Sequence, residues 1–344
     1  MINGSDFLSL KHTGRQTLTL AKPPSVAANA CVAGKKESEG PLGKSFDVTC
    51  DDSYWGEKTW EKAESAMLKM ALRQALNKAN LSSSNIEYIF AGDLLNQCIS
   101  SAFALRDEHI PFFGLYGACS TMVESLALAS LMIDGGFADT TAAVTSSHFC
   151  TAERQFRTPL EYGGQRTPTA QWTVTGAGAV ILSSEGPGPY ITHVTPGKIV
   201  DAGIKDGNNM GAAMAPAAYD TIKAQFDDLG YSPDDYDMIV TGDLGKVGSE
   251  ILYDLFRSDG IDISEKHADC GLMIFAPEQD THAGGSGCGC CASVLGGHIL
   301  NGMREGKWKN VLVAATGALM STTSSQQGES IPGISCAVRI SVSR

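Results

Sequence analysis

The residues with the clearest chemical potential lie in a short glycine-rich stretch, residues 114–121, which reads Gly-Leu-Tyr-Gly-Ala-Cys-Ser-Thr. An apolar run precedes the glycines and helix-forming residues follow, which predicts a strand, a sharp turn and a helix. Cys119 would then lie at the helix N-terminus, where unpaired backbone N–H groups and the helix dipole favour a thiolate over a thiol. The pattern predicts a nucleophilic or pocket-lining cysteine; the alternative is a small residue that the tight turn requires.

The same pattern recurs at residues 284–291, which read Gly-Gly-Ser-Gly-Cys-Gly-Cys-Cys, and it places Cys290 opposite Cys119. Two further pairs of blocks match in the same order along the chain. They are 86–94 with 236–244 and 179–182 with 337–340. Matching blocks in one order, with spacings that change as loop lengths differ, indicate two copies of one unit.

These motifs are positioned by elements that predict an α/β fold. Both cysteine-bearing turns lead into helices, 120–134 and 292–303, that are apolar on all sides but too short to cross a bilayer, which is typical of buried helices. We expect the two helices to pack together between two sheets, with Gly296 and Gly297 permitting their close approach. The predicted architecture is a five-layer α/β/α/β/α sandwich built from two duplicated halves. The principal predicted strands are 86–91, 140–145, 236–241 and 309–316.

Composition suits two units of ordinary domain size and limits the classes of function. The 344 residues are 43% hydrophobic and carry a formal net charge of −12. Such an acidic chain is not expected to bind nucleic acid or anionic lipid in general. A Pro- and Gly-rich linker at 185–189 predicts the boundary between an N-terminal half, 1–186, and a C-terminal half, 187–344.

No stretch is long and apolar enough for a signal peptide or a transmembrane segment, so we expect synthesis in the cytosol and mainly reduced cysteines. Cys288, Cys290 and Cys291 do not have the spacing of a structural zinc site, and no metal is predicted. Gly176 and Gly178 fall inside a predicted strand without the spacing of a dinucleotide fingerprint, so no cofactor is predicted either.

A second group of polar residues follows the strand at 140–145. His148 comes at its C-terminal end, where ligands gather in α/β sheets, although a structural histidine is the alternative. The connection 149–171 is long and polar, and such segments are usually functional or disordered. Its arginines, which include Arg154, Arg157 and Arg166, are either solvated surface charges or a guanidinium clamp, since paired planar donors suit carboxylates.

Several longer strings resemble a known family. The duplicated unit with a cysteine on the turn into a buried helix resembles the thiolase and ketoacyl-synthase superfamily. More closely, five strings are similar to the stage V sporulation protein AD family, and the resemblance covers nearly the whole chain. They are 92–97 (Gly-Asp-Leu-Leu-Asn-Gln), 115–121, 151–157, 169–178 and 326–332.

This resemblance implies a thiolase-like protein that binds dipicolinic acid, alone or as its calcium chelate, and supports its uptake into the developing spore. It also implies peripheral association with the spore inner membrane, beside other membrane proteins of the same sporulation uptake system; a homodimer is a further expectation. Dipicolinic acid is a planar pyridine with two carboxylates. The residues expected around it are Cys119, His148, Arg154, Arg157, Tyr162 and Gln171.

Condensing enzymes of the superfamily commonly place a His or Asn just after the strand equivalent to 236–241. Here that position holds Asp243, and an acidic side chain opposes a developing enolate. A second expected His can be aligned with His282. The sequence therefore favours a non-catalytic, ligand-binding protein. The alternatives are an acyltransferase that uses Cys119 as acyl-accepting nucleophile together with His282, and a purely structural spore protein.

Overall fold

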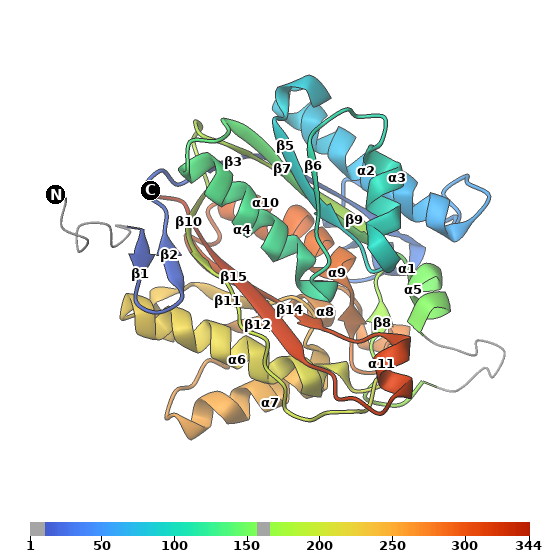
Figure 1. Ribbon diagram of the computed structural model, residues 1–344, viewed down its shortest axis with the longest axis vertical. Helices are drawn as coiled ribbons and strands as arrows, with labels where there is room; N and C mark the ends of the chain where they lie inside the picture. The colour runs from blue at the N-terminus through green and yellow to red at the C-terminus, as the bar shows by residue number, and fades with distance from the viewer. Residues whose placement is uncertain (1–10, 157–165) are drawn as a thin grey trace.

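The computed structural model describes residues 11–156 and 166–344, which form a layered α/β molecule (Figure 1). The first set of strands is β3 (Ser25–Gly34), β5 (Tyr88–Gly92), β6 (Phe112–Gly114), β7 (Thr140–Ser147) and β9 (Gly176–Ser183). The second set is β10 (Tyr190–Thr195), β11 (Met238–Thr241), β12 (His267–Asp269), β14 (Asn310–Ala318) and β15 (Gly333–Ser341).

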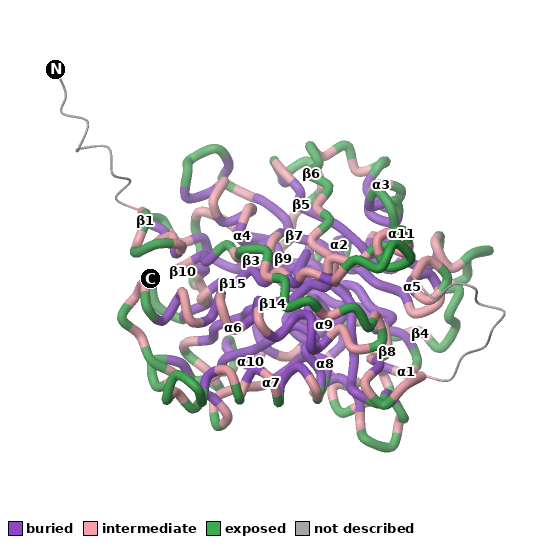
Figure 2. The backbone as a smooth tube through the Cα atoms, turned by 60° about the horizontal axis from the view of Figure 1, so that its bottom comes forward, coloured by how far each residue is buried: buried purple, intermediate pink, exposed green. Residues whose placement is uncertain are grey.

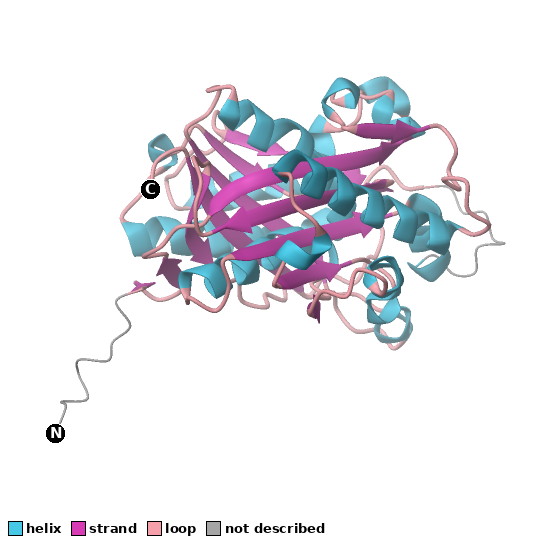
Figure 3. Cartoon of the chain, turned by 90° about the horizontal axis from the view of Figure 1, so that it is seen from above, coloured by secondary structure: helices cyan, strands magenta, loops and turns pink. Residues whose placement is uncertain are grey.

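The helices that cover these strands are α2 (Trp60–Ala79), α3 (Ile99–Leu105), α4 (Thr121–Asp134), α5 (Phe149–Phe156), α6 (Met210–Leu229), α7 (Gly245–Ser258), α9 (Cys288–Val294), α10 (Leu300–Arg304) and α11 (Thr322–Gln326). The smaller elements are β1 (His12–Thr13), β2 (Thr17–Thr19), α1 (Lys35–Ser38), β4 (Val48–Cys50), β8 (Trp172–Thr173), α8 (Cys270–Met273) and β13 (Gly285–Ser286). Seen from above, the strands run across the molecule with helices on both sides (Figure 3).

The two sets of strands pair in the same order. In the first set β5 is parallel to β6 and β7, and β9 is antiparallel to both β7 and β3. In the second set β11 is parallel to β12 and β14, and β15 is antiparallel to both β14 and β10. One pairing, Tyr190 on β10 with Ser25 on β3, joins the sheets. The repeat in the sequence is therefore a repeat of strand order.

The hydrophobic core has three parts because both faces of each sheet are covered. On β5, Ile89 and Ala91 face the cluster under α2 and α3, whereas Phe90 faces a middle cluster that includes α4, α9 and α10. On β11, Ile239 likewise faces α6 and α7 while Val240 faces the middle cluster. Figure 1 shows these layers from top to bottom, and Figure 2 shows that the centre is buried. The predicted five-layer α/β/α/β/α sandwich is confirmed.

The buried helices agree with the prediction in position but differ in detail. Helix α4 packs against α9. The second helix begins at Cys288 rather than at residue 292, and a π-helical turn, Leu295–Ile299, separates α9 from α10. Gly296 and Gly297 lie in that turn and face strand β3 instead of α4. A Cβ at Gly297 would lie 2.8 Å from the Cys31 sulfur. The close approach that these glycines permit is between helix and strand.

Replacing Gly296 by Leu should therefore overpack the core. Even a Cβ at this position would lie 3.0 Å from the Ala30 carbonyl oxygen on the backbone of β3, which cannot move freely. We expect a loss of about 1–3 kcal/mol or more in the free energy of unfolding. Denaturant unfolding measures it, with Gly296→Ala as the intermediate case. An unchanged midpoint for the Leu variant would contradict this account.

Within the described ranges, no helix combines the length and the apolar character needed to cross a bilayer. The layered core and the turns that leave it are what position the candidate site.

Candidate functional site

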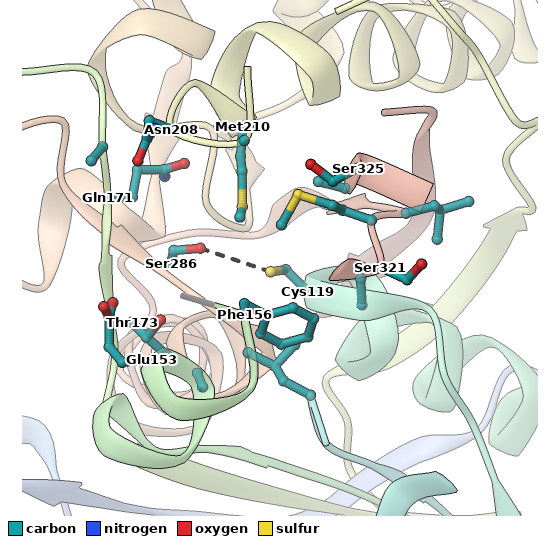
Figure 4. A pocket seen from close by; sticks show the side chains of 18 of the residues that line it. Cys119, Glu153, Phe156, Gln171, Thr173, Asn208, Met210, Ser286, Ser321 and Ser325 are labelled. Carbon is teal, nitrogen blue, oxygen red and sulfur yellow. Dashed lines mark hydrogen bonds between the residues drawn. The ribbon is translucent and has the colours of Figure 1, made fainter. Parts of the chain in front are cut away.

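A cavity of about 580 Å³ opens beside Cys119. Its walls come from distant parts of the chain: the turn before α4, helix α5, strand β8, the loop before α6 and the loop around α11. Gln171 and Asn208 lie on one side of the sulfur and Ser321 and Ser325 on the other (Figure 4). The described residues that line it are Leu94, Tyr116, Ala118, Cys119, Ala152, Glu153, Phe156, Arg166, Ala170, Gln171, Thr173, Gly207, Asn208, Met210, Ser286, Ala318, Leu319, Met320, Ser321, Ser324 and Ser325.

Cys119 lies in a single 3-10 turn, Ala118–Ser120, directly before α4, as the sequence predicts. The Thr121 hydroxyl donates to the Ala118 carbonyl oxygen at 2.6 Å and accepts from the Gly117 N–H at 3.1 Å, which fixes the turn. The Cys119 side chain is 6% exposed. Its sulfur is 3.8 Å from the hydroxyl oxygen of Ser286. These contacts hold the cysteine in the wall of the cavity.

Asp243 lies behind Ser286, in the loop that follows β11. Its buried carboxylate accepts hydrogen bonds from the Ser286 hydroxyl at 3.0 Å, the Gly287 N–H at 2.9 Å and the Thr316 hydroxyl at 3.0 Å. Burial raises the pKa of Asp243. A buried acid therefore adjoins the turn that carries Cys119.

This environment keeps the Cys119 thiol protonated. Burial, and then the charge of Asp243, raises the pKa of Cys119 well above its usual value. The helix dipole favours the thiolate but is outweighed, since desolvation of a fully buried anion can shift a pKa by several units. Burial therefore acts against the expected dipole-activated thiolate. Cys119 lines the cavity and can contact a ligand there, and its role as a nucleophile stays a prediction.

A buried acid and an amide hold the Asp243 loop in place. Asp269 accepts from the Thr241 hydroxyl at 2.7 Å and from the Leu244 and Gly245 N–H groups at 2.8 and 3.0 Å. Gln171 donates both amide hydrogens to carbonyl oxygens of this region, to Asp243 at 2.6 Å and to Gly285 at 2.9 Å. Gln171 lines the cavity as the sequence predicts, and it also supports the loops that carry Asp243 and Ser286.

The two predicted histidines, His148 and His282, form hydrogen bonds to backbone groups instead of lining the cavity. His148 donates through Nε2 to the Ser53 carbonyl oxygen at 2.8 Å, and its Nδ1 accepts from the Cys150 N–H at 3.1 Å. It is 1% exposed, and burial lowers its pKa. His148 is thus a structural histidine, and it is absent from the described cavity lining.

His282 does not complete a catalytic pair with Cys119. Its Nδ1 is 2.7 Å from the Thr167 carbonyl oxygen and its Nε2 is 3.4 Å from a carboxylate oxygen of Asp280. It too is absent from the described lining of the cavity. The described part of the chain places Asp243 and Ser286, and not an imidazole, beside the sulfur.

The two described arginines of the segment 149–171 differ in position: Arg166 lines the cavity and Arg154 does not. Arg154 forms an ion pair with Glu61, lies over the Trp60 ring and is 48% exposed. It is not among the described lining residues of the cavity, and its clamp role stays a prediction. Arg166 lines the cavity and donates to a carboxylate oxygen of Glu153 at 2.9 Å. Its guanidinium carbon lies 5.1 Å from the centre of the Trp172 ring. The predicted residues Arg157 and Tyr162 lie outside the described residues.

Sequence reasoning missed part of the polar wall. Ser321, Ser324 and Ser325 contribute hydroxyls from the α11 region, and Asn208 contributes an amide from the loop before α6. The run Ser-Thr-Thr-Ser-Ser at 321–325 was a visible signal, because such a dense cluster of hydroxyls at the end of a predicted strand favours a polar binding surface.

Comparison with known proteins finds relatives along nearly the whole chain. A model of the family described as stage V sporulation protein AD matches residues 14–341. The chain is also 50% identical over 325 residues to stage V sporulation protein AD of Bacillus subtilis (strain 168), which spans 94% of this chain and 96% of that protein.

Solved structures with the same fold are more distant. One is 3-oxoacyl-[acyl-carrier-protein] synthase III from Aquifex aeolicus VF5, with a TM-score of 0.57 and 14% identity over 92% of this chain and 99% of that chain. Another is a variant of Xanthomonas campestris OleA, with a TM-score of 0.58 and 15% identity over 96% of this chain and 99% of that chain. At these identities the likeness establishes a thiolase-like fold and does not show which chemistry the site performs.

Proposed function

The chain belongs to the stage V sporulation protein AD family and has a thiolase-like fold, and we propose that it is a non-catalytic member that binds dipicolinic acid and supports its uptake into the developing spore. One observation carries the proposal. The cavity beside Cys119 has a guanidinium and several hydroxyl and amide groups on its walls, and the described residues place Asp243 and Ser286, not an imidazole, beside the sulfur.

The chemistry of the cavity supports this ligand class. Arg166 offers paired planar donors for a carboxylate, and the serine hydroxyls around α11 offer neutral donors for a second one. Tyr116 and Phe156 provide aromatic surface for a pyridine ring. The volume of about 580 Å³ lies in the usual range of small-molecule sites. Arg166 is already bonded to Glu153, so a calcium chelate that neutralises the carboxylates is a second form for the same site.

A calorimetric titration of the full chain with dipicolinate tests the proposal directly. Pyridine-2-carboxylate, which lacks one carboxylate, is the matched ligand control, and each titration is repeated with excess calcium. We expect saturable binding of dipicolinate and a much weaker signal for the monocarboxylate. No heat of binding and no shift in melting temperature at millimolar dipicolinate, with or without calcium, would exclude this function.

The alternative, an acyltransferase that uses Cys119, is supported by the position of this residue in the lining of a cavity. Its chemistry is opposed by the raised pKa of the thiol and by the acidic neighbour, since a thiolate is the nucleophile and an oxyanion needs donors. We expect no acyl-enzyme when the protein is incubated with an acyl-CoA near neutral pH, as read by intact-mass spectrometry. Stoichiometric acylation that Cys119→Ser abolishes would instead establish the acyltransferase.

The proposal includes partners. The protein would act at the spore inner membrane beside the membrane proteins of the same uptake system. It would do so as a homodimer, because strand β6 lies at the end of the strand order with Phe112 and Phe113 39% and 47% exposed. Residues 110–118 carry no charge that would repel a second strand. Light scattering that finds a monomer well above micromolar concentration would contradict the dimer.

A further inference from the structure

We propose that the buried carboxyl group of Glu64 is a proton switch beneath one wall of the cavity, so that this wall loosens and the ligand is released when Glu64 loses its proton. The inference deepens the function proposed above, because it concerns regulation of the same site. It stands on the contacts of two buried carboxyl groups that play no part in contacting the ligand.

Glu64 connects helix α2 to helix α5. Its carboxyl group accepts from the Thr151 hydroxyl at 2.6 Å and from the Ser146 hydroxyl at 3.2 Å, and all three side chains are buried. Thr151 belongs to α5, and three other residues of that helix, Ala152, Glu153 and Phe156, line the cavity. The position of this wall therefore depends on the carboxyl group of Glu64.

Asp93 holds the adjoining part of the same wall. Its carboxylate accepts from the Leu95 N–H at 2.9 Å and from the Ser101 N–H and hydroxyl at 2.8 and 2.6 Å. Leu94, which lies between Asp93 and Leu95 in the chain, lines the cavity. The Leu94 carbonyl oxygen accepts from the Gln155 amide of α5 at 3.0 Å and from the Tyr116 hydroxyl at 3.0 Å.

Among residues 11–156 and 166–344, no Lys, Arg or His forms an ion pair with the carboxyl group of Glu64 or Asp93. The titratable groups that face this pair from neighbouring elements are Cys98, Tyr116 and Cys288, and burial raises the pKa of each, so all three are neutral in the physiological range. Nothing among these groups compensates a second negative charge.

The proton belongs mainly to Glu64. Burial raises the pKa of Asp93 as well, but Asp93 accepts three hydrogen bonds, two of them from N–H groups, that favour its charged form. Glu64 accepts two, both from hydroxyl groups that can also act as acceptors. Burial, and then the charge of Asp93, raises the pKa of Glu64 to about 8. Because this folded pKa exceeds the ordinary value, the contribution of Glu64 to stability is complete in acid and is lost as pH rises through about 8.

Above that pH both Glu64 and Asp93 are negatively charged at buried positions. Their repulsion is lowered most simply when α5 moves away from α2 and water enters. We take only molecules with protonated Glu64 to keep the wall closed and bind the ligand. One unit above the pKa of Glu64 these are about a tenth of the molecules, so the apparent dissociation constant rises about tenfold. Dipicolinate stays a dianion over this range, so the ligand itself does not explain such a change.

The test compares the full chain with Glu64→Gln, which is neutral at every pH, by dipicolinate calorimetry at about pH 7 and about pH 9. We expect roughly tenfold weaker binding of the parent at the higher pH and little change for Glu64→Gln. Asp107→Asn, an exposed acid at 65%, is the matched control and should follow the parent. Equal pH dependence of the parent and Glu64→Gln would overturn the switch.

A ligand-free arm separates this inference from the proposed ligand. Hydrogen exchange of residues 149–156 should be equal in the parent and Glu64→Gln at about pH 7 and faster in the parent at about pH 9. That result without dipicolinate binding would disprove the ligand and support the switch; equal exchange at the higher pH would disprove the switch. Thr151→Val, which cuts the link from Glu64 to α5, should also remove the pH dependence, and it replaces Glu64→Gln if that variant fails to fold.

Discussion

Replacing Arg166 by Ala should weaken dipicolinate binding roughly ten- to a hundredfold, because a hydrogen bond to a charged partner contributes about 1.5–3 kcal/mol. Arg166 is the guanidinium among the described lining residues of the cavity, and its side chain is already oriented by Glu153 and by the Trp172 ring. A preoriented donor pair loses little freedom when the ligand binds, so its removal should appear almost fully in the affinity. Calorimetry at moderate ionic strength measures the change.

Two variants sharpen this prediction. Arg166→Lys keeps the charge but loses the planar paired donors, so its affinity should lie between those of the parent and the Ala variant. Arg154→Ala removes an equivalent charge from the neighbouring α5, but on its outer side, where Arg154 pairs with Glu61, and it should bind like the parent. Equal affinities for Arg166→Ala and the parent would show that the ligand does not use this wall.

Asp243→Ala should lower the free energy of unfolding by about 3–5 kcal/mol. The substitution leaves the Ser286 hydroxyl, the Gly287 N–H and the Thr316 hydroxyl without their acceptor, and each buried unsatisfied group costs about 1–3 kcal/mol. Asp243→Asn keeps one acceptor oxygen and should lose less. Denaturant unfolding at fixed pH measures both.

The pH dependence gives this prediction a second readout. Burial raises the folded pKa of Asp243 above its unfolded value, so the parent loses the contribution of this group as pH rises, while the Asn variant does not. The deficit of Asp243→Asn relative to the parent should therefore shrink from acid toward neutral pH. Asp254→Ala, at a side chain 78% exposed, is the control and should change stability by no more than about 0.5 kcal/mol. A loss for Asp243→Ala as small as for this control would contradict the hydrogen-bond account.

The layered fold could be predicted because its signals are long and repeated. The helix expected at 120–134 is α4, Thr121–Asp134, since a segment that is apolar on all sides has few places other than the centre of a molecule. The prediction of a helix at 292–303 was less accurate. Its glycines allow a π-helical turn against β3, and a contact between a helix and a strand far away in sequence leaves no local period to detect.

The site was predicted where the backbone alone decides it and missed where a side chain's direction decides it. Cys119 follows from the glycine-rich turn before a helix, and Gln171 follows from the long polar connection 149–171 and the ligand that the resemblance implies. Glu153 and Arg154 are neighbours on α5, yet about 100° of helical rotation sends one to the cavity and the other to Glu61. His148 comes at the expected strand end, but its ring is bonded to Ser53, which is 95 residues away. Sequence spacing does not encode such long-range contacts.

The burial of Cys119 determines what thiol-labelling reagents can report. An alkylating reagent added to the native protein meets two partly exposed thiols, Cys50 and Cys150, whereas the other eight, Cys119 among them, are buried. Reagents attack the thiolate, so Cys119 reacts when the structure opens and not at the rate of a free cysteine. Five of the buried thiols belong to the middle cluster, and their labelling rate then measures the opening of that layer: Cys31, Cys270, Cys290, Cys291 and Cys336. Slow labelling of Cys119 is expected of the native site and does not indicate an oxidised sulfur.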